Sequence, residues 1–114
     1  MVLLDMRTRQ EYCQGHIIHA LLVPTPPPPL TEREEAVLKD QLWWTLSQNL
    51  TTKSTPIVVY CRKGIRAKIA KKLIQQLGYP KVIAWGGVEE EPLRQIFGGA
   101  LAPSLLCYHD PSPP

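Results

Sequence analysis

Residues 56–67 read Pro-Ile-Val-Val-Tyr-Cys-Arg-Lys-Gly-Ile-Arg-Ala, and they join a strand pattern directly to a helix pattern. The β-branched run Ile57–Tyr60 predicts a short strand buried on both faces. Apolar residues then recur at helical spacing and predict an amphipathic helix, with Ile65, Ile69, Ala70, Leu73, Ile74 and Leu77 on its core side. Cys61 is therefore expected at the corner where the carboxyl end of a strand meets a helix N-terminus, which is where open α/β sheets bind ligands.

This corner suits a reactive thiol. A thiol of ordinary pKa, about 8.5, is only about 3% thiolate at neutral pH, and lowering that pKa by ~2 units requires ~2.7 kcal/mol. A helix dipole contributes only ~0.3–1 kcal/mol. The cations of Arg62, Lys63 and Arg66 and the N–H groups of a loop turned tightly at Gly64 are expected to contribute the rest. Cys61 is a candidate nucleophile on this argument, and the alternative is a buried structural cysteine with three solvated cations nearby.

Strand and helix patterns alternate along the rest of the chain. Short apolar runs predict strands at residues 2–4, before Pro24 and at residues 81–85. A run of prolines at residues 26–29 is expected to form an extended polyproline connection. The alternation predicts an α/β domain with an open parallel sheet of about four to five strands and helices on both faces.

Two further helices are expected outside the central stretch. The capping box at residues 31–34 predicts a helix from Glu32 to about Gln48. Its core face should carry Leu38, Leu42 and Leu46 with Trp43 alongside, and one of Trp43 and Trp44 should remain partly exposed. Acidic residues followed by Pro92 predict a last helix over residues 90–97.

Length and composition limit the possible classes of protein. The chain has 114 residues, of which 44% are hydrophobic and 20% charged, so it should form one globular domain over residues 1–99, followed by a proline-containing tail over residues 100–114. No apolar run is long enough to cross a bilayer, and the N-terminus lacks the features of a signal peptide. A cytoplasmic location is the resulting expectation.

The cysteines, histidines and basic residues do not have the spacing of a metal site or a nucleic-acid-binding motif. The three cysteines, Cys13, Cys61 and Cys107, are widely separated, which argues against a disulfide scaffold or a structural zinc site. His16 and His19 have no ligand partner at metal-site spacing, so no metal and no cofactor are expected. The basic run at residues 62–72 is interpreted as a solvated helix face, because it lacks aromatic interleaving or a reading-helix motif.

Three blocks of the sequence, taken together, resemble the rhodanese (sulfurtransferase) domain family. The first is Asp5-Met6-Arg7 with Glu11-Tyr12, Gly15-His16-Ile17, Ala20 and Pro24; the second is residues 58–67; the third is Leu77-Gly78-Tyr79 with Val82 and Trp85-Gly86-Gly87. The resemblance covers roughly residues 2–97 and implies the rhodanese-like α/β fold. Only four residues precede Asp5, so the domain resembles one that lacks the usual N-terminal segment.

The resemblance implies an enzyme that moves sulfane sulfur through a persulfide on Cys61. The donor would be thiosulfate or a similar small anion, and the acceptor a thiol or cyanide. The side chains of Arg62, Lys63 and Arg66 and the N–H groups of residues 62–66, which include Gly64 and Ile65, would bind the anion. Asp5 and Arg7 are implied as structural support for the loop, with the alternative that they only pair with each other.

Three other functions remain open at this stage. A cysteine phosphatase of related fold needs five residues between cysteine and arginine to encircle phosphate, whereas four, residues 62–65, separate Cys61 from Arg66 here. A non-catalytic interaction module often lacks the cysteine. A persulfide carrier would hand sulfur to a partner protein that docks on Lys68, Lys71 and Lys72.

Overall fold

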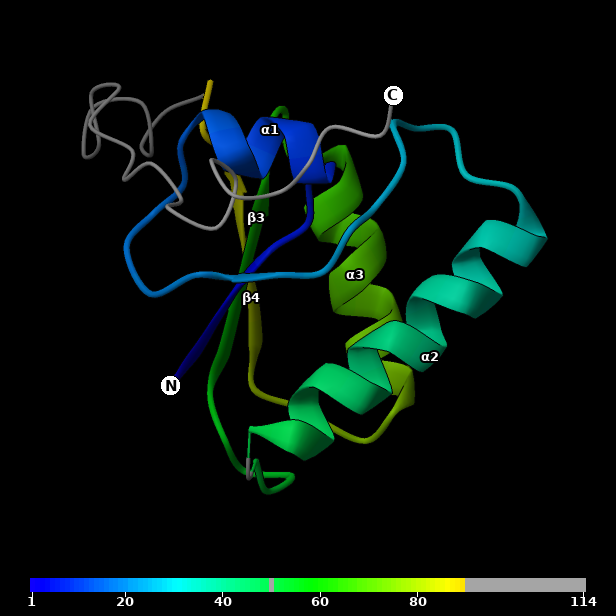
Figure 1. The fold of residues 1–114 in the computed structure, drawn as a ribbon. Coiled ribbons are helices and arrows are strands. Elements are labelled where there is room, and N and C mark those ends of the chain that lie inside the picture. Colours follow the sequence, from blue (N-terminus) through cyan, green and yellow to red (C-terminus); the bar gives the residue numbers. More distant parts are fainter. Residues whose placement is uncertain (50, 90–114) are drawn as a thin grey trace.

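A computed structural model describes residues 1–49 and 51–89 of the protein. Its strands are β1 (Val2–Asp5), β2 (Leu21–Leu22), β3 (Ile57–Cys61) and β4 (Val82–Gly87), and its helices are α1 (Arg9–Gln14), α2 (Glu32–Gln48) and α3 (Ile65–Gln76). The strands form one four-stranded parallel sheet in the order β2-β1-β3-β4. The predicted α/β class and parallel sheet are confirmed (Figure 1). No helix of the described chain is long and apolar enough to span a membrane.

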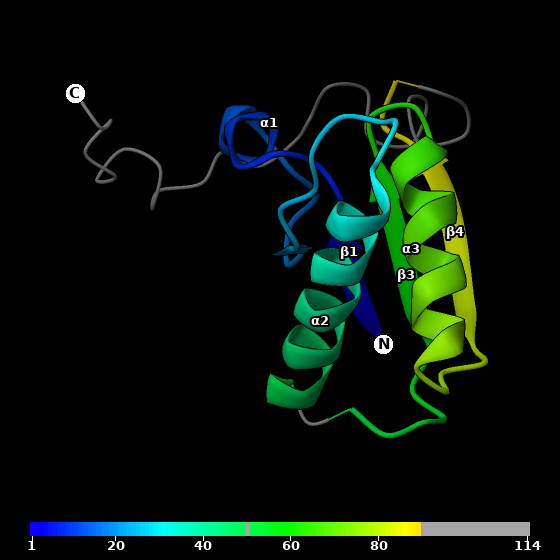
Figure 2. The same ribbon diagram turned by 90° about the vertical axis from the view of Figure 1, so that its right-hand side faces the viewer.

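The sheet register decides which residues meet at its carboxyl end. β1 pairs with β3 so that Asp5 lies beside Tyr60. β4 pairs with β3 on the other side, and a register shift between Val59 and Cys61 brings Cys61 beside Gly87. The strand ends therefore place Asp5, Tyr60, Cys61 and Gly87 next to one another, and α1 lies at this same end of the sheet (Figures 1 and 2).

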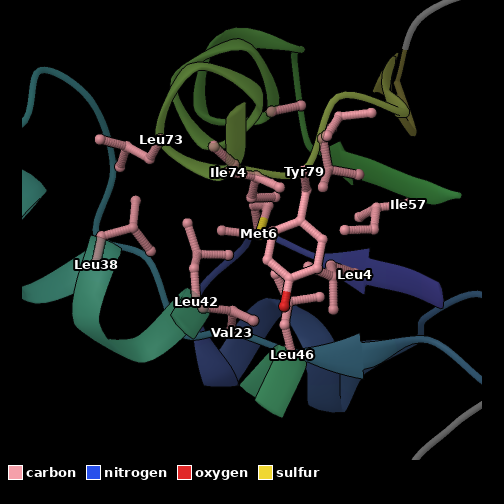
Figure 3. Close-up of a cluster of buried hydrophobic side chains, with 14 of the residues drawn as sticks. Leu4, Met6, Val23, Leu38, Leu42, Leu46, Ile57, Leu73, Ile74 and Tyr79 are labelled. Atoms are coloured by element: carbon pink, nitrogen blue, oxygen red, sulfur yellow. The ribbon is translucent and has the colours of Figure 1, made fainter. Parts of the chain in front are cut away.

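Helices α2 and α3 pack side by side on one face of the sheet (Figure 2). Leu38, Leu42 and Leu46 of α2 are all nearly inaccessible to solvent, as the four-residue spacing predicts. They meet Leu4 of β1, Val23 just after β2, and Leu73 and Ile74 of α3 (Figure 3). Each fully buried aliphatic side chain of this kind stabilises the fold by about 1.5–3 kcal/mol.

The opposite face of the sheet has its own smaller apolar cluster. Tyr60 packs there against Ile17 and Ala20 from the connector between α1 and β2. Leu3, Trp85 and Val88 adjoin it as partly buried neighbours. Tyr60 thus fixes the connector to the end of the central strand.

Most predicted elements match the structure. Strand β3 is buried along its whole length, and α2 spans the predicted residues, with Thr31 and Glu34 forming the expected capping box. The predicted helix over residues 90–97, and the boundary between a domain ending at residue 99 and a tail, lie outside the described residues.

Three local expectations were wrong. Trp43 is 52% exposed instead of lying beside the core, because the stripe formed by residues 38, 42 and 46 covers only one narrow face of α2. Ile65 is also 52% exposed, since as the first residue of α3 it borders the cavity beside Cys61. The proline run bends at residues 27–29 instead of extending straight, because the chain there must turn from edge strand β2 back to the start of α2.

Candidate active site

The Cys61 sulfur is held by the loop that follows β3. Cys61 Sγ accepts a hydrogen bond from the N–H of Gly64 at 2.9 Å and one from the N–H of Ala67 at 3.3 Å. Gly64 is the N-cap of α3 and has a φ of 95°, in the left-handed region that glycine enters without strain. Two backbone donors near the N-terminus of α3 therefore hold the sulfur in place, and such donors bind negatively charged groups.

The end of β4 supports the same loop from the other side. The N–H of Val88 donates to the Cys61 carbonyl at 2.8 Å, and the N–H of Glu89 donates to the Arg62 carbonyl at 3.1 Å. A Cβ on Gly87 would collide with the backbone of Arg62 and Lys63. The glycine is therefore required by the close approach of two backbones, and this contact fixes where the loop lies.

Cys61 is buried but borders a cavity of about 300 Å³. The cavity is lined by residues from two separate stretches of chain: Pro27, Pro28, Cys61, Arg62, Lys63, Ile65 and Arg66. The bent proline run thus forms the wall opposite the cysteine loop. A small molecule entering this cavity would reach the sulfur between cationic side chains on one side and proline rings on the other.

The three loop cations have different environments. Arg66, whose side chain is only 5% exposed, binds the carboxylate of Glu11 at 2.8 Å and also donates to the Thr25 carbonyl at 3.3 Å. Arg62 binds Glu89 at 2.7 Å on the surface. Lys63 makes no ion pair or hydrogen bond with the rest of the described chain, so its ammonium group is available to an anion in the cavity.

Glu11 remains ionised to a low pH in this setting. Its burial would by itself raise the pKa, but hydrogen bonds from Arg66 and from the Thr8 N–H outweigh that effect and hold the pKa of Glu11 at about 2. Glu11 and Thr8 also form a capping box that begins α1. One carboxylate thus starts a helix and neutralises the arginine that faces the loop.

Asp5 and Arg7 form a buried bidentate ion pair at the carboxyl end of β1. Arg7 donates from Nε at 2.9 Å and from a terminal nitrogen at 2.8 Å, and it also donates to the Gly15 carbonyl at 2.6 Å. The Tyr60 hydroxyl donates to Asp5 at 2.7 Å and accepts from the Ile17 N–H at 3.0 Å. Burial, with the charge of Asp5 added, raises the pKa of Tyr60, so its hydroxyl stays neutral and keeps donating. Asp5 therefore binds both Arg7 and Tyr60, the residue just before Cys61.

The structure brings the predicted site residues to one end of the sheet. Cys61 and residues 62–66 form the loop, while Asp5 and Arg7 lie one strand away, connected to it through Tyr60. Glu11, Glu89 and the two cavity prolines were not predicted from the sequence as site residues. Only Glu11 had a local signal, because Thr8-Arg9-Gln10-Glu11 has the spacing of a capping box.

The histidine near this site has a packing role in the structure. His16 stacks on Tyr12 with ring centroids 3.6 Å apart, and its Nδ1 lies 3.1 Å from the Tyr12 carbonyl. A search of the described residues found no group of three or more His, Cys, Asp or Glu side chains that could hold a metal ion.

Comparisons with known proteins point to one family. The family model described as Rhodanese-like domain matches residues 1–90. An E. coli rhodanese solved with anions is 21% identical, with a TM-score of 0.61 over 81% of this chain and 92% of that one. The rhodanese-like domain of an Anabaena protein is 24% identical, with a TM-score of 0.61 over 100% of this chain and 73% of that one. A search of curated protein sequences gave no match.

Proposed function

Because the chain belongs to the family of rhodanese-like domains, we propose that it is a sulfurtransferase that carries sulfane sulfur as a persulfide on Cys61. The proposal rests mainly on the environment of the Cys61 sulfur, which accepts two backbone N–H hydrogen bonds and borders a cavity lined by Lys63. Lys63 has no ion pair to another described residue. The donor class is a small anion such as thiosulfate, and the acceptor is a thiol or cyanide. The reaction needs Cys61 reduced, and Cys61 is a free thiol in the structure.

In the first step the Cys61 thiolate attacks the outer sulfur of thiosulfate. A sulfur–sulfur bond forms to Cys61 while the sulfur–sulfur bond within thiosulfate breaks, and sulfite leaves with the bonding electron pair. In the second step an acceptor thiolate attacks the outer sulfur of the persulfide. A new persulfide forms on the acceptor and the Cys61 thiolate is released, so no external oxidant or reductant is needed.

The loop residues divide this work according to their contacts. Lys63 binds the anionic end of the donor, and the N–H groups of Gly64 and Ala67 stabilise the charge on sulfur. Arg62, whose charge is shared with Glu89, has a smaller part in anion binding, and Ile65 borders the cavity with its exposed side chain. Arg66 is mainly a positioning residue, because Glu11 and Thr25 already occupy its guanidinium group. Asp5 and Arg7 support the loop through Tyr60.

The loop geometry favours sulfur over phosphate. The donors at Gly64 and Ala67 point at Cys61 Sγ, and Arg66 binds a carboxylate outside the loop instead of facing a tetrahedral group within it. A phosphatase needs its arginine free to bind two phosphate oxygens. Hydrolysis of p-nitrophenyl phosphate that is abolished by Cys61→Ala would contradict this preference.

A persulfide carrier is the second candidate, and the basic face of α3 favours it. Lys68 is exposed with no ion pair to another described residue, whereas Lys72 binds Glu35 at 2.9 Å. Lys68→Glu with Lys71→Glu should weaken sulfur transfer to a protein acceptor and leave turnover with cyanide intact. An equal fall in both reactions would exclude docking on this face.

The test is the intact mass of the full chain after incubation with thiosulfate. The wild type should gain one sulfur atom, a reducing thiol should remove it, and Cys61→Ser should gain none. A variant with Cys13 and Cys107 both changed to serine leaves Cys61 as the only cysteine and should gain the same mass. No gain in a folded wild type, with thiosulfate or with an organic persulfide as donor, would overturn the proposal in favour of a non-catalytic binding module.

A further inference from the structure

A second hollow lies on the outer face of α2, away from the cysteine loop. Three large apolar side chains of this helix are substantially exposed: Val37 at 49%, Trp43 at 52% and Trp44 at 60%. A cavity of about 540 Å³ is lined by Val23, Pro24, Asp40, Gln41, Trp43, Trp44 and Thr45. An adjoining one of about 290 Å³ shares Pro24 and Gln41 and continues to Pro26, Arg33, Glu34, Val37 and Leu38. We call the two together the α2 groove.

The α2 groove is separate from the proposed active site. None of its lining residues lines the Cys61 cavity, whose proline wall begins at Pro27. Its tryptophans are also not needed by the core, because Leu38, Leu42 and Leu46 already bury the inner face of α2. Two adjacent exposed indoles on a surface helix represent apolar area that a partner can remove from water.

The groove also holds an unpaired negative charge. Asp40 is exposed, lines the cavity with both tryptophans, and has no ion pair or hydrogen bond to another described residue. Of the other carboxylates of this helix, Glu35 binds Lys72, Glu34 caps the helix through Thr31, and Glu32 does not line the groove. A carboxylate beside two indole faces favours a cation, which gains an ion pair and a cation–π contact together.

The wall opposite the helix limits what kind of segment can bind. It consists of Val23, Pro24 and Pro26, and the two prolines have no N–H to donate. A partner strand that needs ladder hydrogen bonds is therefore disfavoured. A polyproline II segment makes no such bonds, and its rings pack on aromatic side chains with little loss of conformational entropy.

We propose that the α2 groove binds a proline-rich segment of a partner protein that carries an arginine or lysine beside its prolines. The helix from Arg33 to Trp44 extends for roughly 16 Å at 1.5 Å per residue. A polyproline II segment rises about 3.1 Å per residue, so about five residues fill that length. The cation meets Asp40, and the proline rings lie on Trp43 and Trp44.

The test measures binding of a fluorescein-labelled peptide, one arginine followed by five prolines, to the full chain by fluorescence anisotropy. The wild type should bind it saturably, and Trp43→Ala with Trp44→Ala should weaken binding at least tenfold. Asp40→Asn should weaken binding of this peptide several-fold but not that of a peptide with glutamine in place of arginine. Ile18→Ser is the matched control, because Ile18 is an apolar residue outside the groove whose exposed fraction is 65%. This variant should bind the peptide like the wild type.

Several results would overturn this assignment. One is the absence of saturable binding at millimolar protein concentration. Another is that a glycine–serine peptide with the same arginine binds as tightly as the proline peptide. A third is that Ile18→Ser weakens binding as much as the double tryptophan variant does. Analytical ultracentrifugation measures the oligomeric state. If the wild type is a dimer and the double tryptophan variant is a monomer, the groove binds a second copy of this chain instead.

Discussion

Glu11 and Arg66 bind each other through two hydrogen bonds, at 2.8 and 3.2 Å, and so connect α1 to the first turn of α3. The pair closes one side of the cysteine loop and neutralises its most buried cation. The charge that remains free for the proposed anionic donor is consequently smaller than the run at residues 62–66 suggests.

Glu11→Gln should destabilise the protein by about 1–3 kcal/mol, because it leaves the guanidinium of Arg66 without its charged partner in a nearly buried position. Urea denaturation measures this change. Glu35→Gln is the matched control, since it removes an exposed ion pair with Lys72 that should contribute about 1 kcal/mol or less. If the two variants lose the same free energy of unfolding, burial of the Glu11–Arg66 pair does not increase its contribution to stability.

The same pair predicts how stability depends on pH. The pKa of Glu11 is lowered from 4.5 to about 2 in the folded protein, so its contribution is complete above pH 4.5 and is lost as the pH falls toward 2. The free-energy difference between wild type and Glu11→Gln should therefore shrink across this window. Urea titrations at several pH values measure it, and a difference that stays constant down to pH 2 would contradict the role of the ionised carboxylate.

Lys63→Ala should raise the thiosulfate concentration at half-maximal rate about tenfold, because it removes a charge that borders the cavity and has no ion-pair partner within residues 1–49 and 51–89. Arg62→Ala should have a smaller effect, since Arg62 shares its charge with Glu89. Initial rates with cyanide as acceptor measure both changes. A larger effect at Arg62 than at Lys63 would show that the Arg62 ion pair opens when the donor binds.

The sequence predicted the elements of this fold well because their signals are local. The capping box at Thr31, the four-residue spacing of α2 and the β-branched run of β3 each act within a few residues. The strand-to-helix corner likewise placed Cys61 correctly at the carboxyl end of β3. The exposure of Trp43 was mispredicted because helical spacing does not tell how wide a buried face will be. That of Ile65 was mispredicted because the spacing does not show that the first residue of α3 borders a cavity.

The partners of the loop cations could not be predicted in the same way. Glu11 and Arg66 are 55 residues apart, and Arg62 and Glu89 are 27 apart. Which carboxylate reaches which cation depends on the sheet order, which no local pattern specifies. The proline wall of the cavity was missed for a similar reason, since its position follows from where β2 pairs with β1.

Tyr60→Phe should destabilise the protein by about 1–3 kcal/mol, because it leaves the buried Ile17 N–H without an acceptor and removes one donor from Asp5. Thermal or urea unfolding measures the effect. Tyr79→Phe is the matched control. Among the described residues the Tyr79 hydroxyl meets only the partly buried Thr51 hydroxyl, at 3.0 Å, so the loss of stability should be about 1 kcal/mol or less. If both variants unfold alike, the Tyr60 hydroxyl does not hold the connector to the sheet.

Gly87→Ala should impair persulfide formation on Cys61 at least tenfold, since its methyl group would collide with the backbone of Arg62 and Lys63. The loop must then shift, and the N–H of Gly64 would no longer point at the sulfur. Overpacking of this kind costs about 1–3 kcal/mol, so the variant is expected to fold with reduced stability. The rate of mass gain with thiosulfate, together with circular dichroism as a check of folding, measures both effects.

Gly86→Asn is the control for that experiment. Gly86 has open space around a Cβ and a φ of 87°, a conformation that asparagine tolerates better than other side chains. This variant should form the persulfide at close to the wild-type rate. A folded Gly87→Ala that reacts as fast as Gly86→Asn would mean that contact between β4 and the loop does not position Cys61, and the two N–H groups from α3 would then have to hold the sulfur by themselves.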